Sequence, residues 1–284
     1  GRKRWFYPNE IDIEYDEKGR PVKATARDDG LAVAYGGTEK MSKSKNNVVE
    51  PRDIIGRFGA DTARAFVMFA GPPDQSAAWS NSGAEGTYRF LRRLWSYCHA
   101  RRDAVAKAGP VDPALLAAPL KAARREIHLN LKQADFDYQR VQYNTVVSAA
   151  MKMLNALDDA KLGDSPAEGA LAREGLGILL RVLYPIAPHI THRLWQELGY
   201  AAALGDLLDA AWPGADEAAL RQDEIELVVQ VNGKLRGAIR VPAAADKQAI
   251  EAAALADPAV QKFVAGSTVR RVVVVPGKLV NVVV

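Results

Sequence analysis

Hydrophobic residues recur with a helical period from Gly83 to about Leu198, and this pattern constrains the fold more than any other feature. An amphipathic helix must bury its apolar stripe, so a run of such helices joined by short breaks predicts an α-helical bundle. Helices are expected over 84–108, 113–134, 137–160, 167–184 and 188–198. Breaks are expected at Gly109-Pro110, at Asp135 to Asp137 as a cap, at Gly163 to Pro166, and at Pro185 with Pro188. The predicted core of the bundle includes Leu176, Leu179, Leu180, Leu183, Leu194 and Trp195.

The stretch before the bundle has a different pattern. Ile11, Ile13 and Tyr15 alternate with polar residues, and the turn signal Asp16 to Pro21 follows. A period of two bounded by turn residues predicts a small β-hairpin region within residues 7–38.

Short helices are predicted between Pro51 and Phe69. Pro51 suits a first helical position, and Asp61 can cap or complement the N-terminus of a helix over 60–69. Gly71-Pro72-Pro73 then ends the helical pattern.

The last sixty residues predict a compact α+β module. Asn232-Gly233 is a strong two-residue hairpin signal, and it lies between the expected strands Ile225–Val231 and Leu235–Val241. Two short helices, about 246–255 and 257–264, and two further strands, 268–275 and 279–284, give the order β-β-α-β-β.

The predicted fold class is therefore multidomain and mainly α. A chain of 284 residues is too long for one compact core, which supports several units. The expected units are a small β-rich N-terminal piece (1–39), a lysine-rich loop with short helices (40–82), the helical bundle (83–212), a polar, alanine-rich linker (213–223) and the C-terminal α+β domain (224–284).

Composition sets limits on the class of protein. Cys98 is the only cysteine, which excludes an internal disulfide framework and a cysteine-based zinc cluster. The apolar runs are too short to span a membrane, and Gly1 opens no leader pattern, so we expect a cytoplasmic protein and a piece excised from a longer one. The net charge of +4 resides in residues 225–284, which predicts either a polyanionic partner or a solvated surface.

The segment Lys40-Met41-Ser42-Lys43-Ser44-Lys45-Asn46-Asn47 packs three cations, two hydroxyls and two amides into eight residues. Ammonium groups and hydroxyls bind phosphoryl oxygens, so the segment predicts a phosphate clamp. A solvated loop without a ligand is the alternative that composition alone leaves open.

The string Lys40 to Ser44 matches the KMSKS signature of class I aminoacyl-tRNA synthetases, and Gly59 to Arg64 looks like the helix start that follows it in that class. The bacterial leucyl enzymes resemble the chain most broadly. Segments that carry this resemblance are Trp79 with Ser82 to Gly86, Arg89 to Trp95, Pro185 to Trp195, Val229 to Lys234, and Val275 to Leu279. It is weakest at residues 1–38 and 160–175, and residues 1–38 look like the remnant of the leucine-specific insertion.

The resemblance implies part of a leucine-tRNA ligase, in which ATP activates leucine for transfer to tRNA(Leu). Lys43 would touch the ATP phosphates, with Lys40 beside it as a second catalytic lysine, and Met41, Ser42 and Ser44 would complete the ATP-binding loop. Mg²⁺ is expected only as the companion of ATP. The His-x-Gly-His signature, the leucine pocket and the editing domain lie upstream in that family, so we expect this piece, a monomer, to be inactive alone.

His189-Ile190-Thr191-His192 is a decoy for that second signature. The segment follows the lysine loop instead of preceding it and lacks the glycine. Two histidines at this spacing also suit a metal, but without an evident third ligand we expect packing and capping roles and no metal site.

Cationic residues suggest where tRNA binds. Arg89, Arg92 and Arg93 lie on one flank of the first bundle helix, with Arg101 and Arg102 further along, and such a flank either follows a phosphate backbone or is solvated. Resemblance to the anticodon-binding bundle favours tRNA. Lys121, Arg124, Arg125 and Lys132 are further candidates. In the terminal module the candidates are Asn232, Lys234, Arg236, Arg270, Arg271 and Lys278.

Two alternatives stay open. The first is a stand-alone RNA-binding protein that merely inherited the lysine loop. The second is a related valyl, isoleucyl or methionyl enzyme, against which the small terminal α+β module argues.

Overall fold

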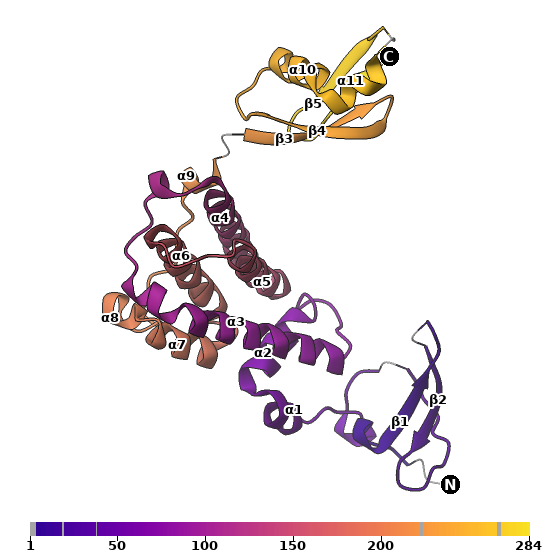
Figure 1. Cartoon of the computed structure of the whole chain (residues 1–284). Coiled ribbons are helices and arrows are strands. Elements are labelled where there is room, and N and C mark those ends of the chain that lie inside the picture. The colour runs from indigo at the N-terminus through magenta and orange to yellow at the C-terminus, as the bar shows by residue number, and fades with distance from the viewer. Residues whose placement is uncertain (1–3, 19, 38, 222–223, 266–267) are drawn as a thin grey trace. The chain divides into compact units, whose positions relative to one another are not determined.

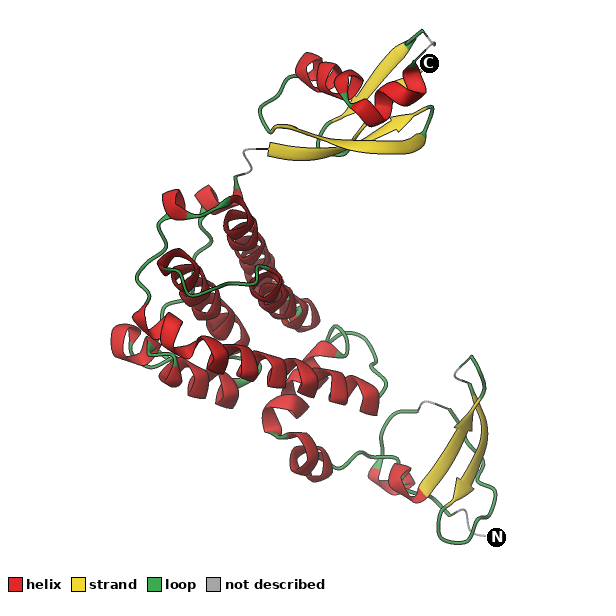
Figure 2. Ribbon diagram, in the orientation of Figure 1, coloured by secondary structure: helices red, strands yellow, loops and turns green. Residues whose placement is uncertain are grey.

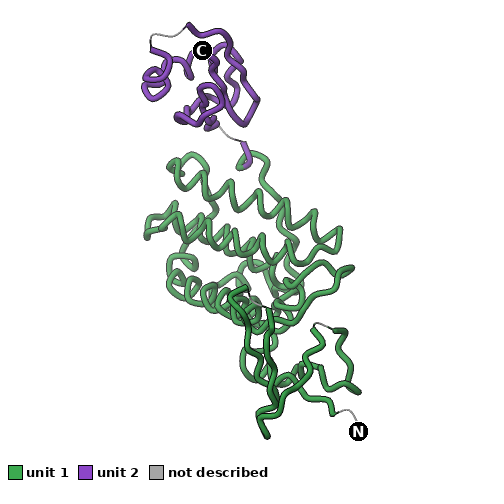
Figure 3. The backbone as a smooth tube through the Cα atoms, turned by 90° about the vertical axis from the view of Figure 1, so that its right-hand side faces the viewer, with its two compact units in different colours: residues 1–219 green, residues 220–284 purple. Residues whose placement is uncertain are grey.

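The computed structural model describes residues 4–18, 20–37, 39–221, 224–265 and 268–284. It divides into two compact units, Gly1–Ala219 and Leu220–Val284 (Figure 3). About 54% of the described residues are helical, so the structure is mixed α/β with helices predominating. Figure 1 labels the elements along the chain, and Figure 2 shows that the strands of the described residues lie in its N-terminal and C-terminal parts.

The N-terminal hairpin is confirmed. Strands β1 (Ile11–Tyr15) and β2 (Pro21–Ala26) pair antiparallel, and the β2 residues Ala24 and Ala26 are buried. The Asp16 carboxylate closes the turn by accepting hydrogen bonds from the backbone N–H groups of Lys18 and Arg20 and from the Arg20 side chain. Because these bonds favour the ionised form, the pKa of Asp16 lies below its ordinary value. Gly19 of the predicted turn lies outside the described residues.

Helices α1 (Pro51–Phe58) and α2 (Ala60–Phe69) follow, with Pro51 at the first helical position as predicted. Asp61 lies in the first turn of α2, where its charge complements the N-terminus of the helix as predicted, but it does not cap that helix. Gly59, at φ 85°, precedes that helix as its N-cap, and the Asp61 carboxylate instead reaches the start of α7 (Pro188–Glu197). The unpaired N–H groups of a neighbouring helix therefore attract Asp61 more than those of its own first turn.

The five predicted bundle helices are present as α3 (Asn81–Lys107), α4 (Ala118–Gln139), α5 (Tyr143–Asp159), α6 (Pro166–Leu183) and α7, with the short α8 (Tyr200–Leu204) after them. Ser165 and Glu168 form a capping box at the start of α6. A 3-10 turn over Pro113–Leu115, which Asp112 caps, replaces the first predicted turn of the second helix.

The break expected at Asp135 to Asp137 is wrong. Helix α4 continues to Gln139 because Asp137 is buried within it and the hydroxyl of the next residue, Tyr138, donates to the Val182 carbonyl of α6 at 2.7 Å. The chain turns at Val141 instead, in the left-handed region at φ 59°.

The predicted core is confirmed. The bundle buries Leu176, Leu179, Leu180, Leu183, Leu194 and Trp195. Trp195 is fully buried, and its ring stacks on Tyr200 with the centroids 4.6 Å apart. Its Nε1 donates to the Gly205 carbonyl at 2.9 Å, so the one polar atom of the side chain is satisfied.

The start of the predicted linker is attached to the bundle. It includes a helical turn, α9 (Glu217–Leu220), and the side chain of buried Arg124 on α4 binds both Glu174 of α6 and Asp216 at 2.7–2.8 Å. Arg124 is therefore engaged inside the fold and is a poor RNA contact. Lys132 likewise pairs with Glu217. Residues 222–223 of the predicted linker lie outside the described part.

This Arg124 cluster gives a pH-dependent stability. Burial opposes ionisation of Glu174, but the adjacent His128 and Arg124 outweigh it, and its pKa lies below its ordinary value. The hydrogen bond from Arg124 also lowers the pKa of Asp216. A lowered folded-state pKa stabilises the fold above the unfolded value, about 4 for these carboxyl groups, and the contribution is lost as pH falls through the folded value.

We therefore expect chemical unfolding of the wild-type chain to show stability falling as pH drops below about 4, with a smaller fall in Arg124→Leu. Lys132→Leu is the control, since its pair with Glu217 is exposed and contributes little. Identical acid profiles for the wild type and Arg124→Leu would contradict this role of the cluster.

The described residues of the second unit form a four-stranded sheet with two helices. Its strands are β3 (Glu224–Val231), β4 (Lys234–Pro242), β5 (Arg271–Val275) and β6 (Leu279–Val283), and its helices are α10 (Lys247–Ala256) and α11 (Pro258–Val264). The strand order is β4-β3-β6-β5, with β3 and β6 parallel. Asn232 (φ 49°) and Gly233 (φ 78°) form the predicted tight hairpin turn. The core joins Leu227, Val229, Val280 and Val282 of the sheet to Ile250 and Val260 of the helices.

Candidate functional site

The lysine loop folds around Asn47. Residues Lys43–Lys45 form a 3-10 turn. The Asn47 side chain forms hydrogen bonds to the extended segment that precedes this turn. Asn47 Oδ1 accepts from the Ser42 N–H at 2.6 Å, and Asn47 Nδ2 donates to the Lys40 carbonyl at 3.2 Å. The hydroxyls of Ser42 and Ser44 lie 2.9 Å apart. The loop conformation is thus fixed by groups of its own sequence.

The three lysines of the loop have different surroundings. The Lys45 ammonium binds the Glu39 carboxylate at 2.6 Å and lies 5.8 Å from the centroid of the Trp5 ring. That hydrogen bond lowers the pKa of Glu39. Lys40 and Lys43 are exposed, and neither side chain has an ion pair or hydrogen bond within the described ranges. Of the three lysines of the loop, Lys40 and Lys43 are therefore the ones whose ammonium groups are accessible to an anion.

An apolar hollow of about 720 Å³ adjoins the loop. Met41, Lys45 and Asn47 reach it from the loop, and its apolar walls include Trp5, Ile11, Ile13, Tyr35 and Trp79. The predicted ATP-binding residue Met41 therefore lies against an apolar wall, with 44% of its surface exposed.

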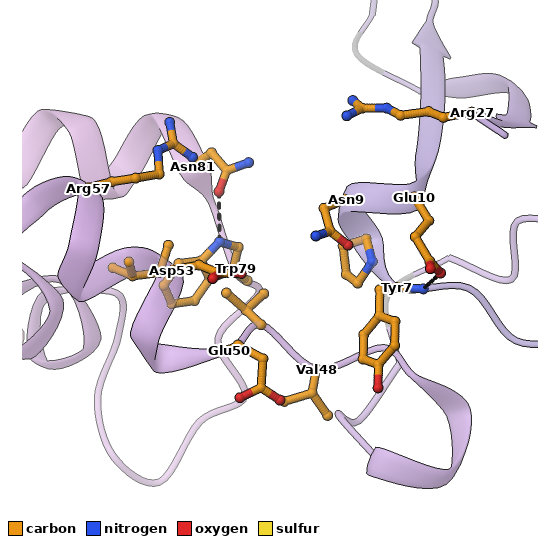
Figure 4. Close-up of a pocket in the computed structure, with 13 residues that line it drawn as sticks. Tyr7, Asn9, Glu10, Arg27, Val48, Glu50, Asp53, Arg57, Trp79 and Asn81 are labelled. Atoms are coloured by element: carbon orange, nitrogen blue, oxygen red, sulfur yellow. Dashed lines mark hydrogen bonds between the residues drawn. The ribbon is translucent and has the colours of Figure 1, made fainter.

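A second pocket, of about 510 Å³, lies where the N-terminal hairpin region meets α1 (Figure 4). Trp79, whose Nε1 donates to Asn81 Oδ1 at 2.9 Å, stands on one side of the opening, and Asn9 stands on the other. Its charged lining residues have both signs: Arg27, Arg57, Glu10, Glu50 and Asp53. No single ligand chemistry fits this lining.

The segment from His189 to His192, at the start of α7, is hydrogen-bonded to α2. The Asp61 carboxylate accepts from the N–H groups of Ile190 (2.6 Å) and His189 (3.3 Å), and it lies 2.7 Å from His189 Nδ1. Arg64 of α2 donates to the carbonyls of Pro185 and Ile186 just before α7. Among the described residues no group of three metal-ligating side chains occurs.

Removing this cap should weaken the helical unit. Asp61 is only 9% exposed, so Asp61→Ala leaves two N–H groups at the start of α7 without their acceptor. We expect a loss of about 1–2 kcal/mol in the free energy of unfolding, and a smaller loss for Asp61→Asn, which keeps an acceptor oxygen. Urea unfolding followed by circular dichroism measures both. Equal stability of Asp61→Ala and wild type would show that the contact is not a cap.

The α3 arginines differ in their position on the helix and in whether they bind other parts of the fold. Arg89, Arg92 and Arg93 fall within about a third of a turn of one another, whereas Arg101 and Arg102 lie elsewhere on the helix. The Arg93 guanidinium binds Asn155 of α5, and Arg101 donates to the Gly163 carbonyl. Arg89, Arg92 and Arg93 are all exposed, and the Arg92 guanidinium lies 5.8 Å from the Tyr88 ring centroid.

The strand register shows which candidate residues of the second unit lie at the same end of the sheet. Val231 pairs with Lys234, the Asn232 N–H donates to Val282, and Arg271 pairs with Val283, so Asn232, Lys234, Arg270 and Arg271 gather at one end of the sheet. Lys278 lies at the other end of β6, where its carbonyl accepts from Val228. Four of the six candidates are thus brought together.

Two of the candidate residues, Arg236 and Asn232, also make contacts within the fold of the second unit. The Arg236 guanidinium lies 3.8 Å from the Phe263 ring centroid, and its Nε is buried with no hydrogen-bond partner in the described part of the chain. Asn232 Oδ1 accepts from the Val284 N–H, and Gly233 donates to Asn281, so the hairpin turn is fixed to β6. Arg236 and Asn232 therefore both make contacts within the fold. For Arg236 the sequence did not indicate this role.

Sequence reasoning missed the roles of Asn47, Glu39 and Trp5 around the loop. The amides after the lysine run were a visible signal for Asn47. No such signal pointed to Trp5, because its contact with Lys45 joins residues forty positions apart in the chain.

The described helices include none that is long and apolar enough to cross a lipid bilayer.

Two family models match the chain. Residues 19–80 match the class I tRNA synthetases for isoleucine, leucine, methionine and valine, and residues 121–251 match the anticodon-binding domain of tRNA ligase. The second match extends beyond Ala219 into the second unit, so the domain boundaries drawn from the sequence stay predictions.

Individual relatives are much more specific. The leucine–tRNA ligase of Methylibium petroleiphilum is 66% identical over 286 residues, and that of Janthinobacterium sp. is 59% identical over 283. Each match covers 100% of this chain and 32% of the relative, so the chain spans about a third of their length. A crystal structure of the Agrobacterium radiobacter K84 agnB2 LeuRS–tRNA–LeuAMS ternary complex matches with a TM-score of 0.71 and 26% identity, over 86% of this chain and 30% of that one. The whole chain is therefore similar to bacterial leucine–tRNA ligases, and it matches the C-terminal third of those enzymes.

Proposed function

We propose that this chain is part of a leucine–tRNA ligase, in which it supplies the loop that binds the ATP phosphates and the modules that bind tRNA(Leu). The observation that carries the proposal is the pair of exposed ammonium groups on Lys40 and Lys43, which have no partner among the described residues. They lie in a loop held by Asn47, within a chain 66% identical to such a ligase.

Lys43 would act at the departure of pyrophosphate. When the leucine carboxylate attacks the α-phosphorus of ATP, negative charge grows on the leaving oxygens, and an ammonium group held there stabilises the transition state more than the ground state. Lys40 would share that charge, and the Ser42 and Ser44 hydroxyls would donate hydrogen bonds to phosphate oxygens.

Mg²⁺ would arrive with ATP. The described residues offer no cluster of three His, Cys, Asp or Glu side chains for it, so the ATP phosphates would supply its ligands on this side of the site.

Binding of tRNA would use cations that the fold leaves exposed. Arg89 and Arg92 on α3, with Arg93 beside them, would contact the phosphate backbone from the bundle. Asn232, Lys234, Arg270 and Arg271 would form a second patch at one end of the terminal sheet, with Arg236 and Lys278 as outlying contacts. Contacts of this kind recognise the shape and phosphates of RNA rather than base edges.

The remaining sequence predictions belong to the same proposal. We place the reaction in the cytoplasm, where a buried, unpaired Cys98 is stable, and we expect the ligase to work as a monomer.

The direct test is leucine-dependent ATP–pyrophosphate exchange by the full-length ligase that carries this segment. We expect exchange with leucine and none with methionine or valine. Exchange that depends on one of those amino acids would reassign the segment to a related synthetase, and no exchange with any amino acid would favour a stand-alone RNA-binding protein.

A further inference from the structure

The Asn47 side chain spans the lysine loop. Its amide binds the Lys40 carbonyl and the Ser42 N–H, two groups that flank Met41 on the strand-like side of the loop. These bonds restrict the backbone between Lys40 and Ser42, and Lys43 begins the 3-10 turn directly after it. One amide therefore restrains the backbone from which the two exposed lysine side chains extend.

Asn46 has a separate task. It occupies the left-handed region at φ 52°, its backbone N–H closes the 3-10 turn by donating to the Lys43 carbonyl, and its side chain donates to the Trp5 carbonyl at 3.2 Å. Asn46 thus attaches the loop to the N-terminal segment, whereas Asn47 braces the loop internally. The conformation of the loop and its attachment are held by different amides.

We propose that Asn47 is a positioning residue for adenylate formation, which holds Lys40 and Lys43 at the spacing that the ATP phosphates require. This inference rests on the proposed function. Without the brace, the segment from Lys40 to Ser42 would sample many conformations, and ordering it at each turnover would cost conformational entropy. Stabilisation of developing charge depends on groups placed before the reaction, so their misplacement by about 1 Å lowers the rate up to a hundredfold.

The test compares Asn47→Ala with wild type in the full-length ligase. We expect kcat for leucine-dependent ATP–pyrophosphate exchange to fall about tenfold to a hundredfold, with KM for ATP changed by less than about threefold. Transfer of leucine from preformed leucyl-adenylate to tRNA should keep its wild-type rate, because pyrophosphate has already left. Asn81→Ala is the matched control, since that amide bonds Trp79 rather than the loop.

The outcomes separate the two claims. If Lys43→Ala abolishes exchange while Asn47→Ala leaves it unchanged, the positioning role is wrong and the proposed function stands. If Asn47→Ala lowers exchange, transfer and thermal stability together, the residue is merely structural and the inference is also overturned. If neither Lys43→Ala nor Asn47→Ala alters exchange, the proposed function itself fails.

Discussion

Replacing Lys43 by alanine should lower leucine-dependent ATP–pyrophosphate exchange by about a hundredfold to a thousandfold in the full-length ligase, because one donor to the developing charge is lost. The binding of leucine should change little, since the lysine contacts only phosphates in the proposed geometry. Lys43 is exposed and has no partner in the described chain, so the substitution removes no contact that stabilises the fold. Pre-steady-state adenylate formation and leucine binding, measured separately, test both parts.

The matched control is Lys45→Ala. It removes the same charge from the same loop, but Lys45 is committed to Glu39 and lies near the Trp5 ring. We expect less than about a tenfold loss of exchange. Equal losses in the two variants would mean that net charge in the loop matters rather than the position of Lys43.

Replacing Trp195 by alanine should destabilise the helical unit by about 3–5 kcal/mol, the usual result of removing a large aromatic side chain from a core. Trp195 is fully buried, stacks on Tyr200 and donates to the Gly205 carbonyl, so the variant loses packing and leaves that carbonyl without its donor. Chemical unfolding monitored by circular dichroism gives the change in free energy.

Trp212 supplies the control. It contacts Tyr138 edge to face but is 43% exposed, so Trp212→Ala removes less buried surface and should cost less than about half as much. A larger loss for Trp212→Ala than for Trp195→Ala would place the core of the unit elsewhere.

Much of the fold could be predicted because its signals are local. The helical period located all five long helices, and Asn232-Gly233 located the terminal hairpin, since only a tight turn suits that pair between two apolar strands. Lys40 to Ser44 likewise indicated the candidate loop directly from its residues.

The failures all involve contacts between distant residues. Asp61 caps α7 rather than α2, and Asp137 lies inside α4 because the hydroxyl of Tyr138, its neighbour in the chain, binds Val182 of α6. Arg124 looked like a surface cation, but Glu174 and Asp216 bind it inside the fold. A charged side chain in one sequence does not reveal its partner, so burial and pairing of this kind need the tertiary structure.

The most direct test is binding of this chain to tRNA(Leu) and to a methionine tRNA, each across a salt titration. We expect tighter binding of tRNA(Leu), and we expect this binding to weaken as salt rises because phosphate contacts release counterions. A folded chain that binds both tRNAs equally, or neither, would contradict the tRNA-binding role assigned to its two units.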